Sequence, residues 1–566
     1  MEAQQEAHER GGVEGGAPGY VQAAARLRGE VQIRESVSIT NHLIMIIEKL
    51  KLLNFKRFRN LEIKFDDQLN VLVGDNESGK SSILQAIDIV MRGSRHMVEE
   101  IGLDRMFNIS VVDSFLGLNP RSIDRLPMMM IEVYLNDTGN PFLNGENNSD
   151  RTNHDGIRCI CQPDMEYSEA IAHILASDDP AFPFEYYKIE FSTFRGDQYN
   201  GHNRPMRGVF IDNSMIGSDF AMFQYVQDIY KAKLTDEERT FAKHKYHTAK
   251  CRFQEDVLAQ YNPKLAGYAF AVKDSSKYNL DTDLTILEGG IDISNKGTGK
   301  QCFIKTELAL KQADDRLDVV LIEEPENHLS HTHMRKMIQA IIESRNKQLF
   351  IATHSNLIST RLNLKKCSIF NSQSTSFVQL KDISEETAAF FMKAPDNNLL
   401  QFILSKKAIL VEGDAEFIMM DFFCKKVLGK SLNSAGVDVI AVDGKCFKRY
   451  LEIARVIGVR TAVITDNDKS YQKNIQDAYT GYMNNEYPKI KVYSDTNDDR
   501  YTFEICVYAD NKGICDSAFG EHLRIHTVLD YMLANKADCA YRLANSEPDD
   551  FVVPGYIQDA LKWIDA

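Results

Sequence analysis

The sequence predicts an α/β protein made of two successive units, each with a mostly parallel sheet. From Ile46, strand-like runs (IIEKLKLLNF, LEIKF, LNVLVG) lead into a Gly-rich turn and an apolar helical stretch, SSILQAIDIVM. Further along, VVLIEE at 319–324 and QLFIATHS at 348–355 bracket the helical run HTHMRKMIQAIIES. After residue 402 the alternation restarts with AILVEG, DVIAVDG and TAVITDND. Strands that alternate with helices are typical of parallel sheets covered by helices.

Length and charge limit the classes of function. A chain of 566 residues exceeds one ordinary domain, and its 43% apolar content is enough for large cores. The formal net charge of −15 excludes a uniformly basic surface for nucleic acid. DNA binding stays open, because a local basic groove or bound divalent ions can offset nearby acidic residues.

Composition also suggests the domain boundaries. We expect a flexible N-terminal extension at 1–44, a first α/β domain at 45–400 and a second at 401–566. Within the first domain, residues 95–285 mix short β-like runs with charged helical stretches, so we expect an insertion there that serves as an arm or dimerisation element. No run of about 18 apolar residues and no secretory signal occurs, which favours a cytoplasmic protein without membrane contact. The ten cysteines show neither zinc-ligand spacing nor a disulfide framework.

A phosphate-binding loop is the strongest motif in the first unit. GDNESGKS fits the pattern G-x-x-x-x-G-K-[ST] and lies between an apolar strand and a helix. Backbone N–H groups of such a loop cradle phosphates, Lys80 would reach the β- and γ-phosphates of ATP, and Ser81 would bind Mg²⁺. The predicted nucleotide-binding residues of the loop are Gly74, Asp75, Asn76, Glu77, Ser78, Gly79, Lys80, Ser81 and Ser82.

The rest of a nucleotide site follows in order. Glu323 and Glu324 end the apolar strand VVLIEE, so Glu323 would hold Mg²⁺ and Glu324 would orient and deprotonate the attacking water. His354 ends the next strand, where it can touch the γ-phosphate. Between 294 and 301, SNKGTGKQ opens a helix, and Ser294 and Gly297 would clamp the γ-phosphate held by another subunit.

These elements, in this order, resemble ATPase heads of the ABC/SMC type. The opening NFKRFR at 54–59 is similar to the edge that begins such heads. The turn at 294–301 departs from the usual LSGGQ signature, and the insertion is too short for a long coiled-coil arm. Because heads of this type work in pairs, the resemblance implies a homodimer or a higher homo-oligomer.

Carboxylates follow two strands of the second unit. Glu412 ends AILVEG with Glu416 four residues later, and Asp466 and Asp468 end TAVITDND. Residues i and i+2 of an extended chain face the same side, so both aspartates can converge where parallel strands end. Several carboxylates in one place repel each other unless a cation neutralises them, and oxygen ligands favour Mg²⁺ or Mn²⁺ over zinc.

This set resembles the Toprim domain, and an ABC/SMC-type head followed by a Rossmann-like Toprim domain resembles OLD-family nucleases. Gabija-type and retron-associated defence nucleases have this layout. The resemblance adds Glu504, in YTFE, as a further metal ligand and Lys536, in KADCA, as a residue that stabilises the transition state. It implies two-metal hydrolysis of DNA by Glu412, Glu416, Asp466, Asp468, Glu504 and Lys536. It also implies ATP gating, an antiphage role and an operon partner, either a helicase-like protein or a retron reverse transcriptase with its msDNA.

Two alternatives remain open at this stage. A repair or structural ATPase could clamp DNA and keep the Toprim domain as a scaffold, although a scaffold does not need mutually repelling acids. A topoisomerase or primase is disfavoured, because no strand-passage domain, assignable nucleophilic tyrosine or zinc ribbon is visible. The basic stretch from Lys243 to Arg252 is interpreted as a solvated helix face.

Overall fold

A computed structural model describes residues 45–566 except 178–180, 202, 214–218, 266, 274–279, 311–316, 345–346, 373–375, 395–397, 443–445, 484–485 and 521–526. The N-terminal extension expected at 1–44 lies outside the described residues. No helix among the described residues combines the length and the apolar character needed to cross a lipid bilayer.

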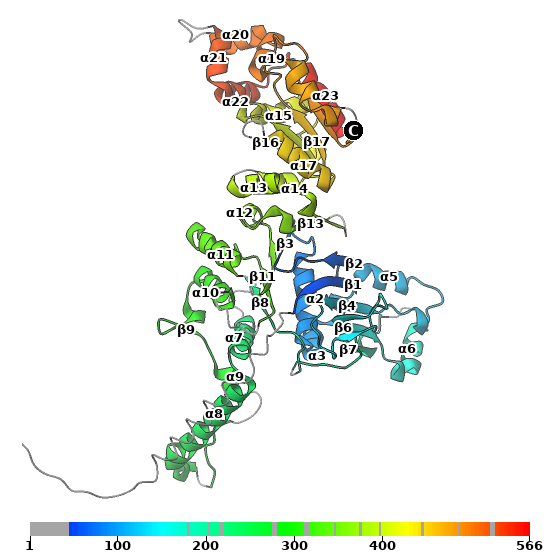
Figure 1. The fold of residues 1–566 in the computed structure, drawn as a ribbon, viewed down its shortest axis with the longest axis vertical. Helices are drawn as coiled ribbons and strands as arrows, with labels where there is room; N and C mark the ends of the chain where they lie inside the picture. Colours follow the sequence, from blue (N-terminus) through cyan, green and yellow to red (C-terminus); the bar gives the residue numbers. More distant parts are fainter. Residues whose placement is uncertain are drawn as a thin grey trace, which may run out of the picture. The chain divides into compact units, whose positions relative to one another are not determined.

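The first α/β unit is built on a six-stranded sheet, here called the head sheet, with the strand order β14-β13-β3-β12-β11-β8 (Figure 1). All neighbouring strands are parallel except β14, which is antiparallel to β13. Strands β11 and β12 are buried along their whole length, as expected for the apolar runs of a covered parallel sheet. The strands are β3 (Leu69–Gly74), β8 (Gly208–Asp212), β11 (Val319–Glu323), β12 (Gln348–Thr353), β13 (Cys367–Phe370) and β14 (Phe377–Gln379).

A second sheet, the side sheet, is antiparallel and has the order β2-β1-β4-β6-β5, with β7 paired to β6. Helix α2 (Lys80–Arg92) contacts β11 and β12 of the head sheet and β4 and β6 of the side sheet. Its apolar residues therefore pack in a core that both sheets share. The side strands are β1 (Ile47–Phe55), β2 (Phe58–Lys64), β4 (Met129–Leu135), β5 (Asn144–Gly145), β6 (His154–Pro163) and β7 (Tyr187–Thr193).

The region expected as an insertion at 95–285 therefore contributes to both sheets. Strands β4 to β7 extend the sheet that β1 and β2 begin, and β8 forms an edge of the head sheet. After β8 this region continues with α7 (Asp219–Lys233) and α8 (Asp236–Asp256), both labelled in Figure 1, and the expected role as an arm or dimerisation element stays a prediction. Helix α8 has no buried residue, and a reciprocal capping box between Thr235 and Glu238 stabilises its start.

The second α/β unit contains a four-stranded, fully parallel sheet with the order β16-β15-β17-β18. Side chains alternate along β15: Ala408 and Leu410 share a core with α17, whereas Ile409 and Val411 share a core with α15, α22 and α23. Helices thus cover both faces, as in doubly wound folds. The strands are β15 (Lys407–Val411), β16 (Val437–Ala441), β17 (Arg460–Ile464) and β18 (Ile490–Tyr493).

The remaining helices connect and cover these sheets. Helix α14 packs against α17 and β16, so the segment between the two units contacts the C-terminal sheet. In the first unit they are α3 (Arg95–Ile101), α4 (Leu103–Met106), α5 (Ile109–Leu116), α6 (Ser168–Leu175), α9 (Leu280–Asp283), α10 (Thr298–Leu310), α11 (His331–Glu343) and α12 (Asn356–Arg361). They continue as α13 (Glu385–Lys393), α14 (Leu399–Leu404), α15 (Asp414–Leu428), α16 (Leu432–Ala435), α17 (Phe447–Ile457), α18 (Thr480–Met483), α19 (Phe503–Asp510), α20 (Lys512–Phe519), α21 (Val528–Ala534), α22 (Lys536–Ser546) and α23 (Gly555–Asp565).

Candidate nucleotide site and carboxylate site

The phosphate-binding loop joins the C-terminal end of β3 to the start of α2. Its turn requires left-handed backbone at Glu77 (φ 61°) and Gly79 (φ 98°), and a Cβ at Gly79 would lie 2.5 Å from the Phe58 ring. Lys80 Nζ donates to the carbonyl oxygens of Gly74 and Asp75, both at 2.8 Å. Burial lowers the pKa of Lys80, although the nearby Glu324 carboxylate opposes this shift. The predicted phosphate-contacting lysine therefore lies inside the loop, close to the predicted catalytic glutamate.

Ser81 and Glu323, the two predicted Mg²⁺ ligands of the nucleotide site, are in direct contact. Glu323 is the last residue of β11, and its carboxylate forms a hydrogen bond with the Ser81 side chain at the start of α2. Burial raises the pKa of Glu323, and the neighbouring Asp212 on β8 raises it further. A buried carboxylate beside a hydroxyl and a second acid is chemically suited to a divalent cation.

Glu324, Glu326 and His354 form a second group beside this pair. His354 Nδ1 lies 2.6 Å from Glu324 Oε2 and 3.7 Å from Glu326 Oε1. Glu326 Oε1 also accepts hydrogen bonds from Thr353 Oγ1 at 2.6 Å and from the His354 backbone at 3.0 Å. One ligand atom from each of these two glutamates and the histidine lies within 4.8 Å of the others. Glu326 Oε2 is buried and has no hydrogen-bond partner among the described residues, so the group has capacity for a cation or a donor from a ligand.

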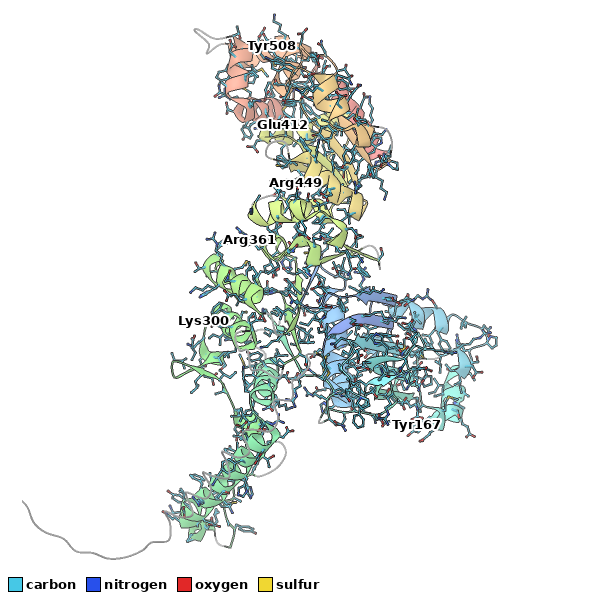
Figure 2. All side chains as sticks on the ribbon, viewed as in Figure 1. Tyr167, Lys300, Arg361, Glu412, Arg449 and Tyr508 are labelled. Atoms are coloured by element: carbon cyan, nitrogen blue, oxygen red, sulfur yellow. The ribbon has the colours of Figure 1, made fainter. Side chains whose placement is uncertain are left out.

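The turn that would clamp a nucleotide in trans is exposed at the start of α10. The hydroxyl and the backbone N–H of Ser294 both donate to Asp292 Oδ1, at 2.6 and 2.8 Å, and nothing would contact a Cβ at Gly297. Lys300, labelled in Figure 2, pairs with Glu288 at 3.0 Å. The roles of Ser294 and Gly297 toward a second subunit stay predictions.

In the second unit, Glu412 and Asp466 meet at the ends of the two central strands. Strand β15 pairs in parallel with β17, so both residues emerge at the same edge of the sheet; Glu412 is labelled in Figure 2. Glu412 Oε2 accepts hydrogen bonds from the Asp466 backbone and from Thr465 Oγ1, each at 3.4 Å. The predicted convergence of these two strand ends is therefore present in the structure.

Two helix starts add Glu416 and Glu504 to this edge. Glu416 lies in the first turn of α15 and Glu504 in the first turn of α19, and both are buried. Burial, together with Glu504 and Glu412, raises the pKa of Glu416 to about 7. Burial, together with Glu412, Glu416 and Glu504, raises the pKa of Asp466 to about 8. These four acids, with Lys536 described below, are here called the carboxylate site.

Lys536 supplies a positive charge to this site. It is the first residue of α22, which packs against α15, and its Nζ lies 3.0 Å from both carboxylate oxygens of Glu504. The lysine side chain is half exposed, whereas that of Glu504 is buried. A single lysine cannot neutralise four carboxylates, so the donor set fits divalent cations held by oxygen ligands.

Asp468 does not follow the alternation that predicted its place. Strand β17 ends at Ile464, and Asp468 adopts left-handed backbone with φ 50°, so the chain is already turning there. The buried Asn467 fixes this turn by donating to the carbonyls of Asp495 and Asn497, both at 2.9 Å. Asp468 is exposed, and the groups that most strongly affect the pKa of Asp466 and Glu416 do not include it. The extended-strand argument for Asp468 was wrong, and its role as a metal ligand stays a prediction.

Comparison with known families assigns both units. Residues 403–468 match the model described as "Overcoming lysogenization defect protein-like, TOPRIM domain", and residues 45–161 match the model described as "AAA ATPase domain". The first match contains Glu412, Glu416 and Asp466, and the second contains the phosphate-binding loop. The chain has the domain order of OLD-family ATPase–Toprim proteins. Its ATPase domain precedes an OLD-like Toprim domain, as the sequence resemblance implied.

Individual relatives resemble parts of this chain. The Old nuclease of Escherichia phage P2 is 24% identical over 197 residues, which cover 31% of this chain and 34% of that protein. The DNA replication and repair protein RecF of Oceanobacillus iheyensis is 44% identical over 52 residues, 9% of this chain and 14% of RecF. The solved C-terminal region of the Burkholderia pseudomallei OLD protein is 17% identical, with 28% of this chain and 97% of that one covered, at a TM-score of 0.24. The chain thus spans about a third or less of the two curated relatives.

Sequence reasoning missed three residues near the two sites. Glu326 could have been found from the spacing of Glu324-Pro325-Glu326, which places two acids in one short loop. Asp212 belongs to no recognisable motif, and it lies beside Glu323 of the nucleotide site because β8 pairs with β11. Tyr556 of α23 lies close enough to the carboxylate site for Asp466 and Glu416 to add to the effect of burial, and its pKa is well above the usual value.

Proposed function

We propose that this OLD-family protein is an ATP-regulated, Mg²⁺- or Mn²⁺-dependent DNA endonuclease. The observation that carries the proposal is the carboxylate site, where Glu412, Glu416, Asp466 and Glu504 gather beside Lys536. A scaffold domain would not retain buried carboxylates that raise each other's pKa, because each charge costs folding free energy without a cation.

The chemistry proposed is hydrolysis of a phosphodiester bond. Bound divalent cations would supply an activated water and stabilise the leaving oxygen. The chain's own residues then have separate tasks: the four acids hold the ions, and Thr465 with the backbone of Asp466 orients Glu412. Lys536 adds a positive charge at the exposed side of the site, where charge on phosphorus would develop.

The ATPase domain is proposed to gate this nuclease. Lys80 would bind the β- and γ-phosphates, Ser81 and Glu323 would hold Mg²⁺, and Glu324 would deprotonate water beside His354. Ser294 and Gly297 would complete the site of a second copy, so we propose at least a homodimer. Resemblance to Gabija-type and retron-associated nucleases supports an antiphage role with an operon partner, either a helicase-like protein or a reverse transcriptase with msDNA.

A plasmid cleavage assay with Mg²⁺, Mn²⁺ or EDTA, with and without ATP, tests the proposal. Asp466→Ala should abolish metal-dependent cutting and leave ATP binding intact. Asp414→Ala is the matched control, because Asp414 is an exposed acid in the same helix turn as Glu416. Cutting by Asp466→Ala would show that the site is misassigned. ATP-dependent DNA binding by the wild type without cleavage in either metal would favour the clamping ATPase instead.

A further inference from the structure

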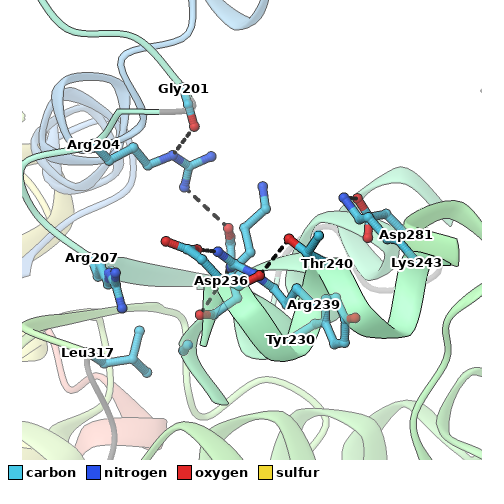
Figure 3. A pocket seen from close by; sticks show the side chains of 14 residues that line it. Gly201, Arg204, Arg207, Tyr230, Asp236, Arg239, Thr240, Lys243, Asp281 and Leu317 are labelled. Carbon is cyan, nitrogen blue, oxygen red and sulfur yellow. Dashed lines mark hydrogen bonds and ion pairs between the residues drawn. The ribbon is translucent and has the colours of Figure 1, made fainter. Parts of the chain in front are cut away.

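A basic cleft lies in the ATPase domain, on segments that neither nucleotide chemistry nor the carboxylate site uses. One cavity of about 440 Å³ is bounded by the C-terminal part of α7, the start of α8 and the chain leading into β8 (Figure 3). Three aspartates and five basic residues line this cavity. The basic residues are Arg204, Arg207, Lys231, Arg239 and Lys243. A second cavity of about 610 Å³ shares Gly201, Arg204 and Lys231 with the first and adds Arg95. The two cavities are therefore adjacent, and together they are called the basic cleft.

Some of these cations are paired within the protein and others are not. Arg239 pairs with Asp236, and Lys243 Nζ lies 2.5 Å from Asp281. Arg204 donates to the Gly201 carbonyl at 3.0 Å and lies 3.6 Å from Asp228, as the dashed lines of Figure 3 show. Asp228 is itself bound more closely by Arg92, at 2.8 Å. The acids of the cleft are therefore already engaged by other cations.

Arg207 and Lys231 are different, because their side chains make no hydrogen bond or ion pair in the described part of the chain. Both are only partly exposed. Burial lowers the pKa of Lys231, and the neighbouring Arg204 lowers it further, although Asp228 and Asp281 act in the opposite direction. The cleft is lined by five cations and three aspartates, so cations outnumber acids in its lining. Two half-buried cations that face a cavity, and that make no direct hydrogen bond or ion pair within the described residues, are suited to an anionic ligand.

The basic surface continues from the cleft along α8. Arg239 and Lys243 line the cleft, and His247 and Lys250 follow at spacings of four and three residues, which places all four on one helix face. From Arg239 to Lys250 the helix rises about 16 Å, roughly five nucleotide steps of B-form DNA. A surface of this length exceeds what one nucleotide or a free phosphate would occupy.

We infer that this cleft and the basic face of α8 bind the phosphodiester backbone of a nucleic-acid strand, at a site separate in sequence from the carboxylate site. The choice of nucleic acid among polyanions rests on the proposed nuclease function. Contacts through Arg207 and Lys231 would go to phosphates and would not depend on base sequence.

The test measures DNA binding without catalysis, by fluorescence anisotropy of a labelled 30-base-pair duplex and a 30-nucleotide strand in EDTA. Arg207→Ala/Lys231→Ala should weaken binding at least about 10-fold and reduce the slope of log affinity against log salt by about 2 for the duplex, since each lost phosphate contact contributes about 0.9. Arg335→Ala/Lys336→Ala, an exposed pair on α11, is the matched control and should bind like the wild type. Arg207→Lys/Lys231→Arg should restore binding, which excludes a simple folding defect.

The outcomes separate this inference from the proposed function. Unchanged affinity and salt slope in Arg207→Ala/Lys231→Ala would overturn the cleft assignment, even if the wild type cuts DNA. The assignment would also be overturned if millimolar inorganic phosphate or ATP displaced DNA and this displacement required Arg207 and Lys231. The cleft would then be a site for small anions. The third outcome is that Arg207→Ala/Lys231→Ala loses DNA binding, while the wild type binds DNA but does not cut it. This result would support DNA binding by the cleft and contradict the nuclease proposal.

Discussion

The two candidate sites gather acids in different ways. In the ATPase domain each glutamate has a partner from the chain: Ser81 for Glu323, His354 for Glu324 and Thr353 for Glu326. In the Toprim domain Glu412, Glu416 and Glu504 all raise the pKa of Asp466, and Lys536 forms its ion pair with Glu504. The difference teaches that chain partners hold each glutamate of the nucleotide site, whereas in the carboxylate site burial and the neighbouring acids raise the pKa of Glu416 and Asp466 to about 7 and 8. The predictions below test this contrast.

The largest expected effect follows removal of the phosphate-loop cation. Lys80→Ala should reduce ATP hydrolysis at least about 100-fold, because its charge would no longer stabilise the developing negative charge on phosphate. Release of inorganic phosphate measures this, with the exposed Lys336→Ala as control. Hydrolysis near the wild-type rate would break the assignment of the nucleotide site.

The next effect concerns the only basic residue placed in the carboxylate site. Lys536→Ala should slow metal-dependent DNA cleavage roughly 100-fold, since a charge aimed at the transition state is lost. Plasmid nicking rates at saturating Mn²⁺ report this, and Lys536→Arg should retain more activity than the alanine variant. Equal rates for wild type and Lys536→Ala would show that the lysine only neutralises Glu504.

A smaller effect is expected at Glu326, which positions Thr353 and His354. Glu326→Gln keeps an acceptor for both donors but removes the charge, so ATP hydrolysis should fall about 10-fold through misplacement of His354. ATP affinity, measured separately by equilibrium binding, should change little. A variant that loses ATP binding but hydrolyses normally at saturation would contradict this role.

The smallest effect is on stability in the absence of metal. The folded-state pKa of Asp466 is raised to about 8 from an ordinary 3.8, so its ionisation opposes folding increasingly as pH rises from about 4 to 8. Asp466→Asn should therefore stabilise the metal-free protein at pH 8 by about 1–3 kcal/mol. Thermal melting with EDTA and with Mn²⁺ checks this: Mn²⁺ should stabilise the wild type far more than the variant. Asp414→Asn, on the exposed side of α15, should show neither effect.

The sequence was most informative where a function lies in one continuous segment. The phosphate-binding loop and the pair Glu323–Glu324 were predictable, because each directly follows a recognisable apolar strand. Glu412 and Asp466 were predictable because parallel strands end at a common edge. Glu504 and Lys536 required the family resemblance, since nothing local distinguishes them from ordinary surface residues.

Other features depend on the fold and were not predictable from local patterns. The turn at Asp468 depends on hydrogen bonds from Asn467 to residues about thirty positions away. The short β-like runs between 95 and 285 belong to two sheets, because β4 pairs with the edge of β1 and β8 pairs with the edge of β11. Arg207 and Lys231 meet in one cleft only after β8 joins the head sheet, so no spacing in the sequence indicates their proximity.

The contact between Gly299 and His328 has a mechanical consequence. A Cβ at Gly299 would lie 2.1 Å from the His328 carbonyl oxygen, so the first turn of α10 rests directly on backbone of the loop that follows β11. The two nearest heavy atoms to that position are both backbone atoms of His328, so there is no flexible side chain end that could give way there. A side chain at position 299 would therefore force the start of α10 and the loop carrying Glu324 and Glu326 apart, so glycine at this position keeps the turn at 294–297 close to that loop.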